Sequence, residues 1–201
     1  QYGNVSRTFK DYDEIASNLL SLPSVKGSAP LIRSQIMATF DNRNTGLEVF
    51  GISYENLLRL DRIAKPEEFE GDMNDFKNGI AIGSGVAREL GVKVGDSIKL
   101  ISPNGVRTAF GTSPRVKQFK IVYIFTAGRY DIDRTRSYLP FSVAQEYFNR
   151  EGLADEIEVL LNNPSNLTEA TSQIENVVAP DVQLWTWRDA SSSFLRALEI
   201  E

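Results

Sequence analysis

The chain has 201 residues, 41% of them hydrophobic and 24% charged, and a net charge of −5. It contains no Cys and no His, which excludes disulfides, thiol nucleophiles, Ser-His-Asp triads and nearly all zinc sites. The acidic balance disfavours a nucleic-acid binder, and no apolar run approaches the roughly 20 residues that cross a bilayer.

The first third of the sequence predicts one helix followed by two strands. Asp11 is the expected N-cap of the helix, and Pro23 ends it. In chain order, the pattern predicts a helix over 11–22, a strand over 31–40, a hairpin turn over 41–46, a strand over 47–52 and an acidic loop over 65–78.

The middle of the chain reads as β-rich with short helices. Gly91 closes the first of these helices, and Ser142 with Gln145 three residues later predicts a capping box for the second. The expected elements are strands over 79–82, 97–102, 119–125 and 137–141, helices over 84–90 and 142–148, and a loop over 103–116.

The last third alternates between strand and helix patterns. It predicts a strand over 156–161, a helix over 166–179, a strand over 182–187 and a final helix capped by Asp189. With one further strand before residue 11, both chain ends would have β-α-β order. The fold class expected is therefore α+β, with a split βαβ (ferredoxin-like) layer from residues 1–40 and 154–201 and a β-rich insertion over 41–153.

Two motifs could hold a ligand, but each has a simpler structural interpretation. Gly83-Ser84-Gly85 follows a strand and opens a helix, as phosphate loops do, although Arg88 occupies the third small position. A tight turn with Ser84 as N-cap is favoured. Asp131-Ile132-Asp133 has the spacing of a metal pair, yet neighbouring arginines explain it as local ion pairs. We expect neither a cofactor nor a metal.

Trp185 and Trp187 lie two residues apart in an expected strand, so both side chains would point to the same face. This face either packs beneath a helix or forms a platform on which a ligand stacks. At the termini, Gln1 is not an initiator Met and the sequence stops at Glu201 within a helical pattern. We expect a piece excised from a longer protein.

The stretch from Pro103 to Gln118 is the strongest local peculiarity. It carries Arg107, Arg115 and Lys117 but no acidic residue, and it also holds Phe110 and Pro114. Residues 99–136 have a net charge of +6, whereas the rest of the chain has −11. Such segregation predicts either steering of an acidic partner or a solvated hairpin tip.

Several segments, in this order, resemble a known family of transporters. The segments 82–87, 90–96 and 98–103 resemble the extracytoplasmic domain of MacB-type ABC permeases. The segments 110–119, 124–125, 138–140 and 144–148 resemble more narrowly the lipoprotein-releasing permeases LolC and LolE. Trp185-Thr186-Trp187 and residues 194–198 resemble the segment that re-enters the membrane.

The resemblance implies a non-catalytic periplasmic domain of an inner-membrane permease, with a split βαβ "Porter" layer and a β-rich "Sabre" insertion. The parent transporter would pair with a second permease subunit and a cytoplasmic ATPase subunit. It would extract lipoprotein substrates and pass them to a LolA-like carrier. Pro103–Gln118 would be the carrier-binding hook, in which Arg107, Arg115 and Lys117 steer the partner while Phe110 and Pro114 anchor it. Pro103 is also among the expected carrier-binding residues.

Two rival functions make different predictions. A MacB- or FtsX-like relay, which couples ATP hydrolysis to an efflux or cell-wall hydrolase partner, would not need the Pro103–Gln118 loop. A carboxylate-based hydrolase would need a deep pocket with a paired Asp or Glu of perturbed pKa. A LolC-like, a LolE-like and a single dual-role permease all remain open.

Overall fold

The computed structural model describes residues 8–108 and 111–190, although not the side chains of 104–108, 111–112 and 190. Its strands are β1 Val25–Phe40, β2 Arg43–Ile52, β3 Glu68–Gly71, β4 Ile80–Gly83, β5 Ser97–Thr108, β6 Gly111–Thr126, β7 Arg136–Pro140 and β8 Glu156–Leu161. Its helices are α1 Tyr12–Leu20, α2 Tyr54–Leu57, α3 Asp61–Ala64, the 3-10 helix η1 Met73–Asn78, α4 Ser84–Leu90, α5 Tyr130–Thr135, α6 Phe141–Phe148, α7 Leu167–Glu175 and α8 Trp187–Ala190.

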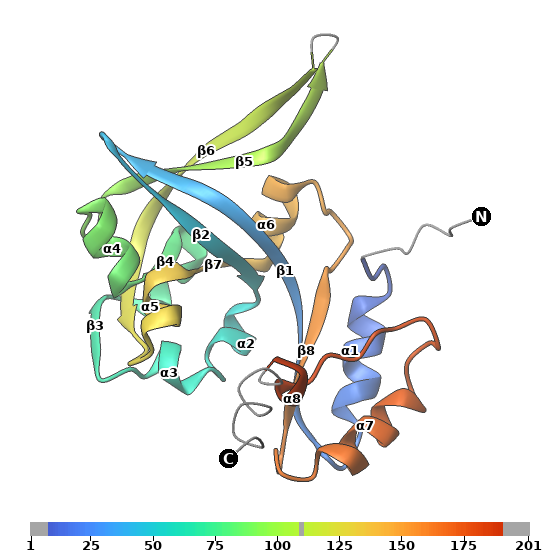
Figure 1. Ribbon diagram of the computed structural model, residues 1–201. Coiled ribbons are helices and arrows are strands. Elements are labelled where there is room, and N and C mark those ends of the chain that lie inside the picture. Colours follow the sequence, from blue (N-terminus) through green and yellow to red (C-terminus); the bar gives the residue numbers. More distant parts are fainter. Residues whose placement is uncertain (1–7, 109–110, 191–201) are drawn as a thin grey trace, which may run out of the picture.

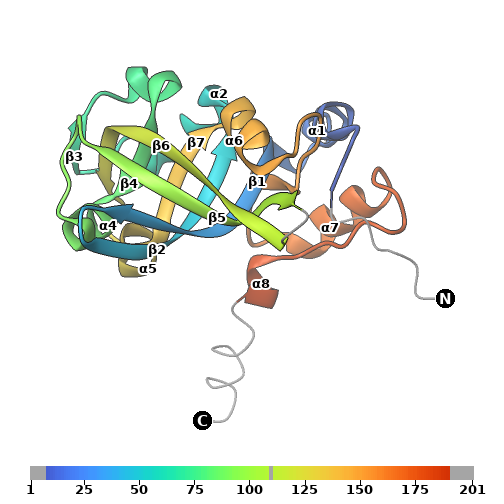
Figure 2. The same ribbon diagram turned by 90° about the horizontal axis from the view of Figure 1, so that it is seen from above.

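Six of the strands form a closed circuit of pairings. The strand order is β2-β7-β4-β6-β5-β1, and β1 pairs in turn with β2, which closes the circuit. The β2–β7 and β4–β6 pairs are parallel, whereas the other pairs in the circuit are antiparallel. Figures 1 and 2 show β1 and β2 curving around this circuit, with β5 and β6 extending out of it as a long hairpin.

Two hydrophobic clusters lie on opposite faces of these strands, because successive side chains alternate between faces. The first cluster includes Ile32 and Ile36 of β1 and is completed by residues of α4 and α6. The second includes Leu31 of β1 and is completed by residues of α2, α3 and η1. The short helices therefore cover both faces, and α6 is fixed beside the base of the β5–β6 hairpin.

A smaller layer of two strands and two helices is built on the N-terminal half of β1. Residues 25–31 of β1 pair antiparallel with β8, and α1 and α7 lie beside this pair (Figure 1). Phe9 and Ala154 also pair through two backbone hydrogen bonds of 2.7 and 3.0 Å. The sequence pattern missed residues 25–30 because Gly27, Ser28 and Pro30 are poor strand formers, which packing against β8 overrides.

The expected four-stranded ferredoxin-like layer is not confirmed. In the described part of the chain, the strands of this layer are β1 and β8. The prediction of a strand over 182–187 is wrong, because residues 182–186 form no strand and α8 begins at Trp187. Thr186 and Asp189 instead form a reciprocal capping box at the start of α8, because the Thr186 amide donates to the Asp189 carboxylate (2.8 Å) and the Asp189 amide to the Thr186 hydroxyl (3.3 Å). Asp189 is thus not the N-cap. The strand expected before residue 11 and most of the final helix fall on residues 1–7 and 191–201, outside the described ranges.

Several local predictions need correction. The acidic loop over 65–78 contains β3 and η1, and the hairpin turn is only Asp41-Asn42, after which β2 begins. Residues 103–116 are largely strand rather than loop. No prediction covered α2, α3 or α5.

Two predicted helix caps also differ from the structure. The N-cap of α4 is Gly83 and not Ser84, and the N-cap of α6 is Pro140 and not Ser142. Asp11 is the N-cap residue of α1, as predicted, although its side chain makes no capping hydrogen bond. Gly91 does close α4, in the left-handed conformation (φ 71°), as predicted.

Candidate functional site

The β5–β6 hairpin contains a bulge that accommodates both of its prolines. Ser102 pairs with Arg115 and Val106 pairs with Ser113, so Pro103-Asn104-Gly105 stands opposite Pro114 alone. Proline has no amide hydrogen and cannot donate to a strand ladder, so it is tolerated where the ladder is interrupted. Beyond the bulge the two strands continue to Thr108 and Gly111, and the hairpin projects past the other elements (Figure 1).

Tyr147 of α6 joins both strands at the base of the hairpin. Its side chain is almost fully buried, and its hydroxyl donates to the carbonyl oxygen of Leu100 (2.8 Å) and lies 3.2 Å from that of Arg115. Its ring also contacts the Phe119 ring edge to face, with centroids 5.5 Å apart. Burial raises the pKa of Tyr147 to about 12, so the hydroxyl remains a donor at neutral pH.

Arg115 binds the C-terminal end of α6. Its guanidinium donates to the carbonyl oxygens of Glu146 (2.8 Å) and Tyr147 (3.0 Å) and to the side-chain oxygen of Asn149 (2.6 Å). The last carbonyls of a helix lack the usual amide partner four residues on, and the C-terminal end of a helix carries partial negative charge. Here the Glu146 carbonyl also accepts from the Asn149 amide (3.3 Å). Arg115 therefore caps α6 from the hairpin, while Lys117 forms an ion pair with Glu146 (3.1 Å).

Arg115→Ala is expected to lower the free energy of unfolding by about 1–2 kcal/mol, because it removes three charge-assisted hydrogen bonds from the end of α6. Lys117→Ala is the matched control and should cost less than about 1 kcal/mol, since exposed ion pairs contribute little. Urea titrations followed by circular dichroism measure both. Equal losses for the two variants would contradict the capping role of Arg115.

The structure distributes the six predicted site residues unevenly. Pro103 and Pro114 are exposed at the bulge. Arg115 and Lys117 are on the side of the hairpin that faces α6 and are engaged there. Arg107 belongs to β5 but its side chain is not described, and Phe110 lies outside the described residues. The proposed steering and anchoring roles thus stay predictions.

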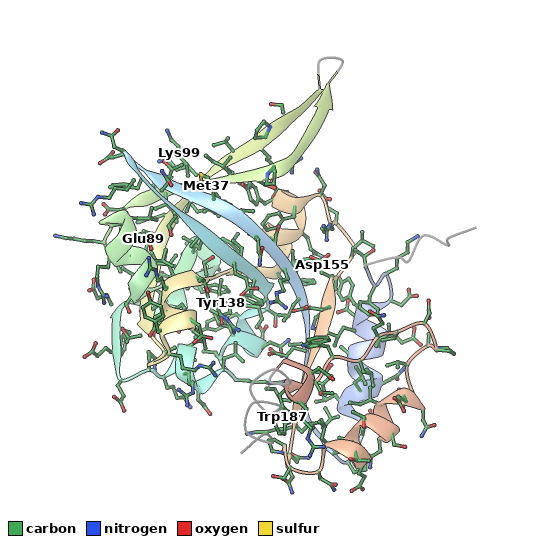
Figure 3. All side chains as sticks on the ribbon, in the orientation of Figure 1. Met37, Glu89, Lys99, Tyr138, Asp155 and Trp187 are labelled. Carbon is green, nitrogen blue, oxygen red and sulfur yellow. The ribbon has the colours of Figure 1, made fainter. Side chains whose placement is uncertain are left out.

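The opposite side of the hairpin exposes an apolar row that the sequence reasoning missed. Met37 of β1 pairs with Ile101 of β5, which pairs with Val116 of β6, so the three lie side by side across three strands. Met37 is 49% exposed and Val116 56%. Lys99 is exposed in the same region, and Figure 3 shows Lys99 and Met37 together at the hairpin base. We call Met37, Ile101, Val116 and Lys99 the outer face.

Alternation within 97–102 could have placed Lys99 and Ile101 on one side of the strand, but the position of Met37 beside them depends on the tertiary pairing of β1 with β5.

The basic residues concentrated between residues 99 and 136 lie in two separate places in the structure. Arg129, Arg134 and Arg136 lie at α5 and the start of β7, where they pair with Asp131 (3.2 Å), Glu89 (3.3 Å) and Glu48 (3.8 Å). Lys99, Arg115 and Lys117 remain with the hairpin.

Gly83 and Gly85 serve close packing of α5 rather than an open phosphate loop. A Cβ atom at Gly83 would lie 2.2 Å from the carbonyl oxygen of Asp133, and one at Gly85 would lie 2.8 Å from it. The Asp133 carboxylate in turn accepts from the amide of Ala127 (2.6 Å). Across the described ranges, no group of three or more Asp or Glu side chains is placed to hold a metal ion.

A charged open cleft of about 450 Å³ lies between β8 and α3. Arg33 on its rim pairs with Glu48 (2.6 Å) and Glu156 (3.6 Å). Desolvation raises the pKa of Glu158, although Arg136 opposes the shift. Arg33 and Arg136 thus line this cleft together with Glu156 and Glu158, and its lining also includes side chains of the second hydrophobic cluster such as Phe50 and Tyr138.

The sequence matches the model of the MacB-like periplasmic core domain over residues 2–177. It is 22% identical, over its whole length, to the "lipoprotein-releasing system transmembrane protein LolC" of Neisseria meningitidis serogroup B, of which it covers 49%. It is 25% identical over 94% of its length to the protein of the same name from Buchnera aphidicola, of which it covers 47%. The chain therefore spans about half the length of these curated relatives.

Two solved structures share the fold at low sequence identity. The periplasmic region of MacB from Actinobacillus actinomycetemcomitans superposes with a TM-score of 0.56, at 10% identity, covering 94% of this chain and 82% of that one. The extracellular domain of the transporter YknZ from Gram-positive bacteria gives the same TM-score at 13% identity, covering 85% and 84%. None of the described helices is both long and apolar enough to cross a membrane. The chain belongs to the family of MacB-like periplasmic core domains.

Proposed function

We propose that this chain is the non-catalytic periplasmic domain of an inner-membrane ABC permease that releases lipoproteins and passes them to a LolA-type carrier. The observation that carries the proposal is the projecting β5–β6 hairpin, which is braced by α6 on one side and exposes apolar and basic residues on the other. The two curated relatives described above are both named lipoprotein-releasing proteins, and these names supply the substrate class.

The bracing favours a docking role because a rigid hairpin binds with a smaller loss of conformational entropy than a mobile one. Tyr147 and Arg115 hold its base, so the outer face keeps one geometry. An exposed apolar row of Met37, Ile101 and Val116 offers area that binding can remove from water, and Lys99 beside it favours an acidic partner.

The rest of the assembly follows from the same proposal. A separate cytoplasmic subunit would hydrolyse ATP, a second permease subunit would complete the transporter, and the membrane-spanning parts would deliver the lipoprotein. The proposal also divides the chain into two units, a "Porter" unit of residues 1–40 and 154–201 and a "Sabre" unit of residues 41–153. β1 would connect them, since residues 25–31 pair with β8 and residues 32–40 with β2.

The decisive experiment is a titration of the chain with the LolA-like carrier of the same organism, beside a variant lacking the hairpin end. Replacing residues 103–114 by Asn-Gly joins Ser102 to Arg115, which are register partners, through a two-residue turn. This variant keeps the bonds of Arg115 and Tyr147 to the hairpin base. We expect it to bind at least about tenfold more weakly than the parent chain.

A second variant, Met37→Ser with Val116→Ser, tests the outer face without shortening the hairpin. Phe69→Ser is the matched control, because Phe69 is also an exposed apolar residue (59%) but lies on β3. Undiminished binding by the shortened variant would remove residues 103–114 from the interface, and undiminished binding by Met37→Ser with Val116→Ser would remove the outer face. If the parent chain itself failed to bind, a MacB- or FtsX-like relay that uses another face would become the better interpretation.

A further inference from the structure

Both tryptophans of the chain, Trp185 and Trp187, are exposed. The sequence contains two Trp residues in total, and 78% of the Trp185 surface and 48% of the Trp187 surface are accessible. Large aromatic side chains contribute most of their stabilisation when buried, so two exposed indoles in one segment indicate a surface that something else covers. Neither ring is buried beneath α7, whereas the final helix, the other expected cover, lies mostly outside the described residues.

The segment that carries the two indoles is held in place by its own hydrogen bonds. The Asp189 carboxylate accepts from the amide of Thr186 (2.8 Å) and from its hydroxyl (2.6 Å). The indole N–H of Trp187 donates to the carbonyl oxygen of Pro164 (3.4 Å), and the Arg188 guanidinium lies 5.4 Å from the Trp187 ring centroid. Exposure of the rings is therefore built into the fold around the start of α8.

This segment and the β5–β6 hairpin lie at opposite ends of the molecule. In Figure 1 the hairpin points to the top while α8 lies near the bottom, and Figure 3 places Trp187 at that lower end. The curated relatives are named transmembrane proteins and are about twice as long as this chain. A bilayer under the α8 end would leave the hairpin pointing away from the membrane, into the space where a soluble carrier could reach it.

We propose that Trp185 and Trp187 insert into the headgroup region of a phospholipid bilayer and fix the orientation of the domain on the membrane. Indole rings favour this region because their apolar faces leave water while the N–H remains near polar groups. The inference rests on the proposed function as a permease domain. It adds a lipid contact made by the folded domain itself, apart from any membrane-spanning helix.

The test uses the two residues as their own reporters, since they are the chain's tryptophans. The 201-residue chain is tethered through a C-terminal hexahistidine tag to phosphatidylcholine and phosphatidylglycerol vesicles that contain a nickel-chelating lipid. Its tryptophan emission is compared with and without a brominated phospholipid. The single-Trp variants Trp185→Phe and Trp187→Phe report on each indole separately, and we expect quenching and a blue shift in both.

The control places a tryptophan at an exposed aromatic position elsewhere. Phe69→Trp combined with Trp185→Phe and Trp187→Phe carries its indole on β3, and its emission should remain unquenched although the tether is the same. Without the tag, Trp185→Ser with Trp187→Ser should reduce vesicle partition at least about tenfold, because about half or more of each indole surface is available for burial.

Quenching of the native tryptophans no greater than that of the Phe69→Trp reporter would overturn the proposal. A blue shift that grows with protein concentration in the absence of lipid would also overturn it, in favour of contact between two copies of the chain. Failure here is distinguishable from failure of the proposed function. Carrier titrations contain no lipid, and the variant shortened at 103–114 should keep its tryptophan quenching.

Discussion

Tyr147→Ala is expected to lower the free energy of unfolding by about 3–5 kcal/mol, the range for truncating a fully buried aromatic side chain. Tyr147 is 1% exposed and contacts Phe119 and Phe148 within the first hydrophobic cluster. Its removal would open a cavity between α6 and the hairpin base and would delete the hydroxyl that joins β5 and β6. Urea unfolding followed by circular dichroism measures the loss.

Tyr147→Phe separates the two contributions because it keeps the ring and deletes the hydroxyl. We expect it to cost about 1–2 kcal/mol, the magnitude of one buried hydrogen bond. Hydrogen exchange of the backbone amides around Leu100 and Arg115 should accelerate in both variants, and more strongly in Tyr147→Ala. Unchanged exchange at these amides would show that the hairpin base does not depend on α6.

Gly51→Ala is expected to destabilise the fold by about 3 kcal/mol, at the upper end of the range for overpacked cores. Gly51 lies in β2 beneath α6, and a Cβ atom there would be 2.3 Å from the Cβ of Ala144 and 3.0 Å from the Cβ of Ile32. No positive φ is involved at this position, so the effect is steric. Thermal or urea unfolding measures this loss of stability.

A double-mutant cycle tests the steric cause directly. Ala144→Gly alone should cost about 1 kcal/mol, mainly from glycine in a helix, because it makes room rather than removing it. Combined with Gly51→Ala it should recover part of the loss, giving a favourable coupling of about 1 kcal/mol or more. Strict additivity of the two changes would mean that α6 and β2 do not meet as described.

Both predictions concern α6 because this helix contacts the hairpin at one end and the smaller layer at the other. Arg115 and Tyr147 connect it to the hairpin, whereas Phe141 meets the Tyr12 ring of α1 with centroids 5.4 Å apart. The Gln145 side chain donates to the carbonyl oxygen of Leu153 (2.8 Å) and lies 3.4 Å from the Tyr12 hydroxyl. Side chains of α6 therefore connect the smaller layer to the base of the hairpin.

The sequence by itself determined those elements whose pattern is local. The helix over 84–90 with Gly91 after it, the strand over 156–161 and the family resemblance depend on residue order alone, and all three agree with the observed elements and the family match. The stretch from Pro103 also stood out in the sequence, because its charge and prolines differ from the rest of the chain, and its role stays a prediction. Strand formation on either side of the bulge was not visible in the sequence, because prolines and glycine lower strand propensity and only the cross-strand pairing overcomes this.

Tertiary structure alone decided what Arg115 and Lys117 of the hairpin do. Arg115 and Lys117 were indistinguishable from Arg107 in sequence, yet α6, thirty residues further along the chain, binds both of them. Met37 joined the outer face because β1 pairs with β5, a contact between residues far apart in sequence. Likewise, Trp185 and Trp187 are exposed because a capping box replaces the expected strand. Long-range pairing and capping compete with local propensity, and their balance depends on neighbours that no local pattern contains.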